Sequence, residues 1–497
     1  MSATSKLGQR PARRSLLAAM VAAPATLVFA RACAAAPAEA DTVSLPDFRR
    51  PGDRDDGAAL ARAFASGRPV HAPAGKGSGP GGRYVVGNDG NSQLPSGATL
   101  TGDGIGRTVF VRSYTGPFAF ILHCDSGSPD VRRNITGLRF RDLSFEDDVA
   151  RGFEPYSYLV MLNGVTDVVF ERVAFRGFRG DGLHLGSGTV SKVERHNVDV
   201  VVRDCIFDGI NANNRNGISI IDGSDVVIER CRFRNTTRQG DGTLGNGDPH
   251  KPLTGLGQPG SIDIEPNADD FAIIRDIVVR GNHFTGGGGY AVSMLLLPNK
   301  DVRVPISGIT IEGNVIENRY GGFDAFGFRG DGAMQSDRGY AITVRDNTVR
   351  GCEKPFIANG MRGLTITGNR FVDCTGHAEL GYDSALANVT LSNNLFERVG
   401  GPQGNALWVR GGADVAITGN RFVDAGAAGR RDGISVAFVT GAMRRYAFSG
   451  NIFTSPTGRT AQPVLLFQDA KLDRGTLRLG DNRQPAATIP IPRLLGM

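Results

Sequence analysis

Short alternating runs of hydrophobic and polar residues recur from about residue 135 to the end of the chain. They read IVVRGNHF, ITIEGNVI, ITVRDNTV, LTITGNRF, VTLSNNLF, VAITGNRF and YAFSGNIF, each with a polar turn before a large apolar residue. Such alternation predicts strands that are buried on one face. The turn position falls at Asn282, Asn314, Asn347, Asn369, Asn394, Asn420, Asn451 and Asn482, and upstream at Leu143, Val173, Cys205 and Cys231.

These turn positions recur every 22 to 33 residues, apart from one gap of 51 residues between Cys231 and Asn282. A second type of strand follows each variable loop and reads DGLHL, NGISI, GSIDI, YAVSM, HAELG, NALWV, DGISV and PVLLF. Two or three short strands per repeat, with loops of unequal length, are typical of a parallel β-helix. We therefore expect an all-β chain of about twelve coils, stacked about 4.8 Å apart.

The turn asparagines have two expected roles. Asparagine tolerates left-handed backbone angles, and its amide can hydrogen-bond to the asparagine of the next coil. We expect a ladder of such bonds along the stack.

The segments DRDDGAALARAF, VHAPAGKGSGPGGRYVV and LPSGATLTGDGIGRTVF precede the repeats. With the repeats, they make the chain from about residue 47 onward similar to the right-handed parallel β-helix proteins of the pectate-lyase-like superfamily. The resemblance implies a short helical N-terminal cap and first coil over residues 41–113, and a single-stranded right-handed parallel β-helix over residues 114–497. It does not define the reaction, because the superfamily includes lyases, hydrolases, epimerases and phage fibre domains.

Residues 1–40 have the features of a twin-arginine signal peptide. Arg13 and Arg14 precede an apolar, alanine-rich run that ends in an A-x-A cleavage pattern at residues 38–40. The run contains Arg31 and is short for a membrane span. We expect cleavage, a periplasmic or secreted protein, and no membrane association afterwards. Residues 1–40 carry a net +4 of the chain's +6, so the remainder has a net charge of +2 and does not indicate a nucleic-acid partner.

Five cysteines lie beyond residue 40. The pairs Cys205 with Cys231 and Cys352 with Cys374 are each one coil apart, which is within reach of a disulfide. Stacked free thiols and disulfides both remain open. No C-x-x-C spacing is present, and we expect no metal site.

In the second type of strand the aliphatic residues point inward, so the residue between them points outward. The outward residues are His184, Ser219, Asp263, Ser293, Asp324, Glu379, Trp408 and Ser435. The resemblance implies that this strand forms the sugar-binding face. We therefore expect His184, Ser219, Ser293, Glu379 and Trp408 to bind substrate, with Trp408 offering a flat ring on which a sugar stacks.

The strand GSIDIEP places two acids on this outward face. Asp263 and Glu265 are two residues apart, about 7 Å between Cα atoms, a spacing suited to the paired carboxylates of glycosidic cleavage. Asp324, two coils away at about 10 Å, is a third candidate. Like charges this close raise the pKa of one group and so supply an acid beside a base. The alternative is that Glu265 ends the strand and that Asp263 is a solvated surface residue.

The 51-residue gap places an insertion directly before Asp263. It carries His250 and Lys251, which we include as catalytic candidates, and it is expected to form a wall of the substrate groove. The D-P-H at residues 248–250 is similar to a motif of alginate epimerases. A solvated loop without a catalytic role is the alternative.

Three functions remain. Hydrolysis of a polysaccharide by paired carboxylates is favoured, because the acid pair follows from strand alternation. A polysaccharide lyase would need a base such as His250 or Lys251 and a cation for the uronate carboxylate, for which Ca²⁺ is the candidate; otherwise no cofactor is expected. A non-catalytic protein that binds an exopolysaccharide during its assembly is the third. The sequence does not indicate the glycan or the oligomeric state.

Overall fold

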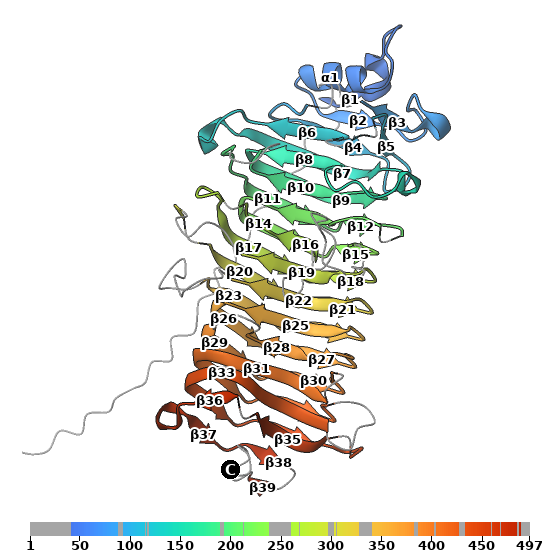
Figure 1. Ribbon diagram of the computed structural model, residues 1–497. Helices are drawn as coiled ribbons and strands as arrows, with labels where there is room; N and C mark the ends of the chain where they lie inside the picture. Colours follow the sequence, from blue (N-terminus) through green and yellow to red (C-terminus); the bar gives the residue numbers. More distant parts are fainter. Residues whose placement is uncertain are drawn as a thin grey trace, which may run out of the picture. The chain divides into compact units, whose positions relative to one another are not determined.

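The computed structural model describes residues 41–87, 93–114, 116, 119–188, 193–211, 213–237, 260–267, 269–296, 303–304, 306–327, 340–381, 386–401, 404–426, 433–458, 460–467, 469–484 and 487–488. Residues Thr42–Met497 form one unit. In it, successive strands pair in parallel with strands one coil away, and each coil contributes to three sheets (Figure 1). Of the described pairs of strands, only β38 with β39 is antiparallel.

We number the three sheets in the order in which most coils visit them. Sheet 1 contains β6 (Leu122–Asp125), β8 (Val160–Asn163), β10 (Leu183–Gly186), β13 (Ile218–Ile220), β16 (Gly260–Ile264), β19 (Tyr290–Leu295), β22 (Gly321–Phe326), β25 (Lys354–Asn359), β28 (Ala378–Leu380), the first parts of β31 (Asn405–Thr418) and β33 (Gly433–Ser449), and β35 (Thr460–Leu466).

Sheet 2 contains β1 (Val43–Ser44), β2 (Val70–Ala72), β4 (Thr99–Gly102), the first parts of β7 (Ile135–Glu146) and β9 (Val165–Arg176), β11 (Val198–Arg203), β14 (Gly223–Glu229), β17 (Ile274–Arg280), β20 (Ser307–Glu312), β23 (Ile342–Arg345), β26 (Arg362–Thr367), β29 (Leu386–Ser392), the second parts of β31 and β33, β36 (Ala470–Leu472) and β37 (Arg478–Gly480).

Sheet 3 contains β3 (Tyr84–Val86), β5 (Val109–Arg112), the second parts of β7 and β9, β12 (Ile206–Asp208), β15 (Arg232–Arg234), β18 (His283–Thr285), β21 (Val315–Glu317), β24 (Thr348–Arg350), β27 (Arg370–Val372), β30 (Leu395–Glu397), β32 (Arg421–Val423), β34 (Ile452–Thr454) and β38 (Arg483–Gln484), followed by β39 (Ala487–Thr488). The helices are α1 (Gly57–Ala65) and the 3₁₀ turns η2 (Leu45–Phe48), η3 (Pro80–Gly82), η4 (Val131–Arg133), η5 (Val149–Arg151) and η6 (Arg474–Thr476).

A continuous hydrophobic core fills the space inside the coils. Ile262 and Ile264 of β16 lie in this core, whereas Asp263 between them does not, as the alternation predicted. Phenylalanines of sheet 3 stack from coil to coil, and the rings of Phe207 and Phe233 are 4.8 Å apart. Repeated side chains in register therefore bury apolar surface along the whole stack.

The predicted asparagine ladder is present between sheets 2 and 3. The amide of Asn314, for example, donates to Oδ1 of Asn347 at 2.9 Å and to the backbone oxygen of Val279 at 3.0 Å. The left-handed residue of each turn is the one before the asparagine, such as Gly313 with φ 61°. Our assignment of left-handed angles to the asparagines is thus wrong, because their side chains point inward, where the neighbouring amides satisfy them.

All five cysteines of the described chain are buried and free. Cys205 and Cys231 occupy the same two-residue turn in successive coils, as the repeat indicated. Their thiols bond to backbone oxygens, for example that of Cys205 to Arg203 at 3.2 Å.

Helix α1 lies at the β1 end of the stacked strands (Figure 1). Its face of Ala59, Leu60, Ala63 and Phe64 is buried in the same core as the sheets. Asp56 precedes the helix, and its Oδ2 accepts hydrogen bonds from backbone N–H groups, including that of Val85 at 2.8 Å. An apolar end of the core is thus covered by an amphipathic helix, as expected for a cap; the boundary between residues 113 and 114 remains a prediction.

Candidate functional site

The sheet 1 pairing places the predicted outward residues in one column. His184 pairs with Ser219, Ser219 with Asp263, Asp263 with Ser293, and Ser293 with Asp324. The column continues through Ile357 to Glu379 and Trp408. The expected order along the stack is therefore correct, with His184 and Asp324 each two strands from Asp263.

Ser435 does not belong to this column. Trp408 pairs with Ala437, whereas Ser435 lies two residues earlier on the same face of β33. Alternation assigns both residues to the outer face and cannot distinguish a register shift of two residues. In the other direction the column continues from His184 to Met161 and His123.

Connections that flank sheet 1 vary widely in length, whereas those between sheets 2 and 3 do not. From β11 onward, two residues separate each strand of sheet 2 from the next strand of sheet 3, whereas β7 and β9 run through both sheets. Between sheets 3 and 1 the connection ranges from residues 318–320 to residues 235–259. Between sheets 1 and 2 it ranges from no connecting residue, where β31 and β33 each run through both sheets, to residues 327–341. Because binding residues concentrate where a rigid scaffold carries variable loops, sheet 1 is the candidate functional face.

Buried polar groups form a connected network around Asp263. His184 Nδ1 lies 2.9 Å from Asp181 Oδ2, and Ser219 Oγ donates to the same oxygen at 2.9 Å. Asn216 Nδ2 donates to Ser219 Oγ at 2.8 Å and to Asp263 Oδ2 at 3.1 Å. With Arg215 and Glu265, these residues form what we call the acid cluster: Asp181, His184, Arg215, Asn216, Ser219, Asp263 and Glu265.

Arg215 joins the two predicted catalytic acids. Its Nη2 lies 3.0 Å from Glu265 Oε2 and 3.8 Å from Asp263 Oδ2. The side chain of Asp263 has no exposed surface, whereas that of Glu265 is 38% exposed. Two acids of unequal exposure therefore share one guanidinium.

The surroundings of Asp263 disfavour its ionised form. Burial raises the pKa of Asp263 well above its usual value, and the negative charge of Glu265 raises it further, against the opposing effect of Arg215. Burial alone would lower the pKa of Arg215, but the surrounding carboxylates raise it. Asp263 is thus a buried carboxyl with a raised pKa beside a guanidinium, rather than the solvated surface residue of our alternative interpretation.

The acid cluster contains buried polar atoms that have no hydrogen-bond partner. They are Asp181 Oδ1, Arg215 Nε and Asn216 Oδ1. Each unpaired buried oxygen costs about 1–3 kcal/mol, so a group of them calls for a ligand or water that satisfies them.

Sequence reasoning missed four members of this site. Asp181 and Asn216 each stand three residues before an outward residue, in the turn that enters sheet 1, and Arg215 precedes Asn216. The ring of Tyr158 stacks on His184 with centroids 4.2 Å apart, within a small apolar cluster outside the main core that also holds Phe120 and Met161. The sequence signal for Asp181 and Asn216 was that each is a polar residue at the start of its motif, DGLHL or NGISI, three positions before the outward residue.

A second group of polar side chains lies further along the column. Glu379 Oε1 is 2.8 Å from His377 Nε2 and 3.6 Å from Lys354 Nζ. The ring of His377 stacks on Trp408 at 4.2 Å, and the guanidinium of Arg410 lies 5.2 Å from the indole centroid. The distal cluster, as we call it, comprises Tyr290, Lys354, His377, Glu379 and Trp408.

The ring of Trp408 already has partners within the protein, since His377 covers one of its faces. Its Nε1 is buried without a hydrogen-bond partner. Stacking of a sugar on this ring remains a prediction, and a hydrogen bond from Nε1 is the interaction that the geometry leaves available.

The other predicted residues differ in what can be said of them. Asp324 is fully buried, and its charge contributes to the raised pKa of Tyr290, for which burial is the main cause. Ser293 is buried, and its Oγ has no hydrogen-bond partner. His250 and Lys251 lie outside the described residues, so their catalytic roles remain predictions.

The described part of the chain holds no group of three or more His, Cys, Asp or Glu residues arranged to bind a metal ion. No helix within the same residues is long and apolar enough to cross a membrane.

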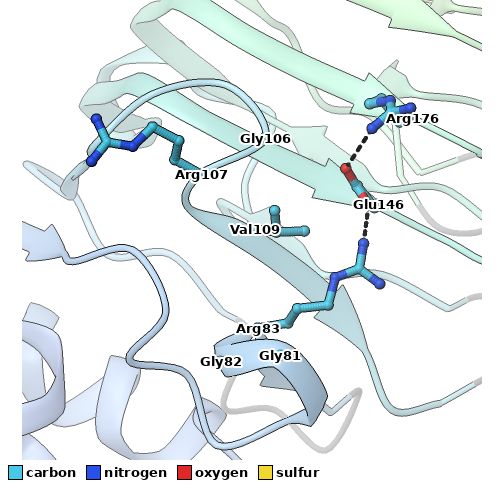
Figure 2. A pocket seen from close by; sticks show the side chains of 8 residues that line it. All are labelled: Gly81, Gly82, Arg83, Gly106, Arg107, Val109, Glu146 and Arg176. Atoms are coloured by element: carbon cyan, nitrogen blue, oxygen red, sulfur yellow. Dashed lines mark hydrogen bonds and ion pairs between the residues drawn. The ribbon is translucent and has the colours of Figure 1, made fainter.

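A surface hollow near the N-terminal end lies apart from this column. Figure 2 shows Glu146 between Arg83 and Arg176, with Arg107 directed away from them. The Glu146 carboxylate forms ion pairs with both neighbouring arginines, at 3.2 Å for Arg176 Nη1. The protein's own charges therefore pair within this hollow, and it contains none of the predicted site residues.

Comparison with known proteins defines the fold class. The family model described as right handed beta helix region matches residues 275–422. The chain is a right-handed parallel β-helix protein, as the resemblance implied.

Solved structures with this fold are distant in sequence. Pre-mature gene product 12 of bacteriophage phi29 is 13% identical with a TM-score of 0.54, and the match covers 90% of this chain and 57% of that one. This chain therefore corresponds to little more than half of the phage protein. The family 28 exopolygalacturonase of Yersinia enterocolitica is 14% identical, with a TM-score of 0.45 and coverage of 91% and 79%.

A mannuronic acid specific polysaccharide family 6 lyase from human gut microbiota is 13% identical, with a TM-score of 0.49 and coverage of 91% and 89%. No curated protein matches the sequence. At these identities the comparisons define the fold, and the reaction has to be argued from the site.

Proposed function

We propose that this protein is a carbohydrate-active enzyme that cleaves a polysaccharide lying along the outer face of sheet 1, by hydrolysis of a glycosidic bond. The observation that carries the proposal is Asp263. It is a fully buried carboxyl whose pKa is raised, mainly by burial and further by the neighbouring Glu265. Glu265, two residues away, supplies the second carboxylate that this chemistry requires.

The unequal environments of the two acids support different roles. Asp263, whose pKa is raised by burial, is placed to donate a proton to the oxygen of the leaving sugar. Glu265 is partly exposed and paired with Arg215, and we assign to it the role of base or nucleophile. A buried acid beside a carboxylate in a more polar environment is a recurring arrangement among glycosidases.

The remaining members of the acid cluster orient these two residues and contact the sugar. Asp181 fixes the His184 ring through Nδ1. Asn216 donates a hydrogen bond to Asp263 Oδ2 and so fixes the orientation of the carboxyl group. We assign substrate binding to His184, Ser219, Ser293, Glu379 and Trp408, as the column predicts.

Two other functions lead to different observations. A lyase would use a base such as His250 or Lys251, with Ca²⁺ on the substrate carboxylate, and its products would carry a conjugated double bond. Tyr290 is a poor candidate for that base, because burial raises its pKa well above the usual value. A binding protein of exopolysaccharide assembly would retain glycan without turnover.

The test is a screen of purified residues 41–497 against acidic and neutral polysaccharides with two readouts, new reducing ends and ultraviolet absorbance of unsaturated products. Hydrolysis predicts reducing ends alone. Asp263→Asn should lower kcat at least 100-fold, as expected on loss of a general acid, and Glu265→Gln should lower it comparably. Glu312→Gln, which removes a partly exposed acid paired with Arg345 on sheet 2, is the matched control and should retain activity.

Absorbance that appears together with the reducing ends would replace hydrolysis with elimination. Tight retention of a polysaccharide with no products would replace catalysis with binding.

We also propose that residues 1–40 direct export through the twin-arginine pathway, consistent with a glycan substrate outside the cytoplasm. Replacement of both Arg13 and Arg14 by Lys should keep the protein in the cytoplasm of an expressing bacterium, as cell fractionation would show. Export of that variant at the rate of the unmodified chain would contradict the proposal.

A further inference from the structure

One outward column of sheet 3 contains no acidic residue. We call it the arginine column. It takes one residue from each strand between β15 and β38, and in chain order its members are Arg232, His283, Val315, Thr348, Arg370, Leu395, Arg421, Ile452 and Arg483. Figure 1 labels strands of this sheet, including β15, β18, β21, β27 and β30, one below another. The column therefore follows the stack of coils.

Many arginines elsewhere on the surface hold a carboxylate from a neighbouring coil. In one example Arg230 Nε lies 2.9 Å from Asp204 Oδ1, and Arg230 Nη2 lies 3.0 Å from Asp204 Oδ2. Arg398 and Arg445 each bind an aspartate through the same two nitrogens. The planar fork of the guanidinium matches the two oxygens of a carboxylate, so this pairing is the usual state of an exposed arginine in this protein.

The arginine column differs in lacking such acids. Arg370, Arg421 and Arg483 are exposed, and none of the three forms an ion pair within the described residues. On either side of Arg421 the column presents Leu395 and Ile452, so neither neighbouring coil offers it a carboxylate. Three guanidinium groups are thus available to an anionic partner from outside the chain.

The three arginines are evenly spaced along a narrow surface. They occupy every second strand, β27, β32 and β38, which places them about 10 Å apart on a line of about 19 Å. Leu395 and Ile452 lie on the strands between them, and Ile452 is 40% exposed. Strands β27, β30, β32 and β34 have three residues each, so two outward side chains, about 7 Å apart, make up the width of the face. Cationic and aliphatic groups therefore alternate along a single line.

This shape and charge spacing discriminate among anionic partners. A stable complex with a globular protein buries about 800 Å² on each partner, which calls for a broader patch than one column. A strand of duplex DNA carries a phosphate about every 3.4 Å, so most of its charges would face no arginine. A linear polymer with well-separated charges and apolar ring faces between them fits both the line and its alternation.

We propose that the arginine column is an accessory binding site for a linear polysaccharide that carries carboxylate groups. The carboxylates pair with Arg370, Arg421 and Arg483, and the apolar faces of the sugars contact Leu395 and Ile452. This inference goes beyond the proposed function and does not rest on it, because the column belongs to sheet 3 and takes no part in cleavage. Each exposed ion pair is weak, so the affinity arises from several pairs on one polymer chain and falls as salt is raised.

Electrophoresis of the purified protein through native gels tests the proposal. Polygalacturonate or alginate is included in the gel, and mobility is compared with that in a gel without polymer. The triple variant Arg370→Gln, Arg421→Gln and Arg483→Gln should raise the apparent Kd about 10-fold, the loss expected for three exposed ion pairs. Its Tm should be unchanged, because these side chains form no ion pair within the described residues.

A second triple variant controls for net charge. Arg230→Gln, Arg345→Gln and Arg445→Gln remove the same number of charges from arginines that already hold a carboxylate. This variant should keep the Kd of the unmodified protein. Any retardation that arises from sheet 1 is common to both triple variants and does not affect their comparison.

A single substitution tests the column from the opposite direction. Ile452→Glu places a carboxylate one strand from both Arg421 and Arg483, where it competes with the carboxylates of the ligand. The apparent Kd for polygalacturonate or alginate should rise, as in the first triple variant. Ile452→Gln, which has the same size without the charge, should change it much less.

Three results would overturn the inference. The first is no retardation of the unmodified protein by either polymer. The second is an equal loss of affinity in the two triple variants, which would reduce the column to a share of the net charge. The third is tighter binding to dextran sulfate, duplex DNA or sedimented phosphatidylglycerol vesicles than to the carboxylated polymers, which would assign the column to a different partner.

Discussion

Asp263→Asn should change the pH dependence of folding as well as the reaction. The folded-state pKa of Asp263 is raised by burial and by Glu265, whereas in the unfolded chain the carboxyl titrates near pH 3.9. Between these two values the folded protein holds a proton that the unfolded chain has released. Stability must therefore fall as pH rises through this interval.

The size of the effect follows from linkage. One proton of difference changes the free energy of unfolding by about 1.4 kcal/mol per pH unit. From pH 5 to pH 7 the unmodified protein should therefore lose up to about 2.7 kcal/mol through the pair of Asp263 and Glu265. The amide that replaces the carboxyl in Asp263→Asn has no proton to exchange, so the variant should lack this slope and be more stable at pH 7.

Denaturation by guanidinium at pH 5, 6 and 7 measures the free energy of unfolding of both proteins. The free energy of unfolding of the variant minus that of the unmodified protein should grow with pH. Taking this difference cancels the contributions of the other titrating groups. Asp414→Asn is the control: its carboxyl pairs with Arg445 at the surface, and this pairing lowers its pKa, so the slope above pH 5 should be retained. Parallel curves for Asp263→Asn and the unmodified protein would refute the assignment of a protonated acid, and with it the proposed general acid.

Three further outcomes are expected. Asn347→Ala should lower the free energy of unfolding by about 3 kcal/mol in the same denaturation assay, because it removes bonds to both neighbouring coils, whereas Asn482→Ala at the end of the ladder should cost less; equal losses would contradict the ladder argument. Burial lowers the pKa of His196, but Asp222 and Glu194 raise it above the usual value, so its contribution to stability is complete below about pH 6.5 and is lost at higher pH. The Tm of His196→Gln should accordingly change less than that of the unmodified protein between pH 6 and 8, and an unchanged pH profile would exclude the ion pairs. The five buried cysteines of residues 41–497 should react with a thiol reagent only after unfolding, and failure to recover five thiols in denaturant would indicate a disulfide.

The repeated elements of this fold could be predicted because each obeys a local rule. Alternation separates Ile262 and Ile264 from Asp263, and an asparagine at the same position of each two-residue turn sets the register of sheets 2 and 3. Where register depends on more than alternation, prediction failed. Ser435 and Ala437 both point outward, so alternation alone could not choose between them. The pairing of β33 with β35 also shifts register between Gly433 and Ile434.

The acid cluster was only half predictable for a different reason. Asp181, Arg215 and Asn216 lie in turns, where the direction of a side chain depends on backbone angles that no periodicity encodes. The burial of Asp263 was likewise beyond strand alternation, which assigns a face but not what covers it. Its protonation therefore became predictable only once its neighbours were known.

Stability and function are concentrated in different parts of each coil. Between sheets 2 and 3 the turns are short and their asparagine amides are satisfied, so that side chains there contribute to folding. Around sheet 1 the connections vary, and buried polar atoms remain unpaired at a cost that the rest of the coil offsets. Substitutions along the column of sheet 1 should consequently reduce ligand affinity more than stability, and those in the ladder should do the opposite; Trp408→Phe, which removes an unpaired donor of the column, and Asn347→Ala measure the two sides of this division.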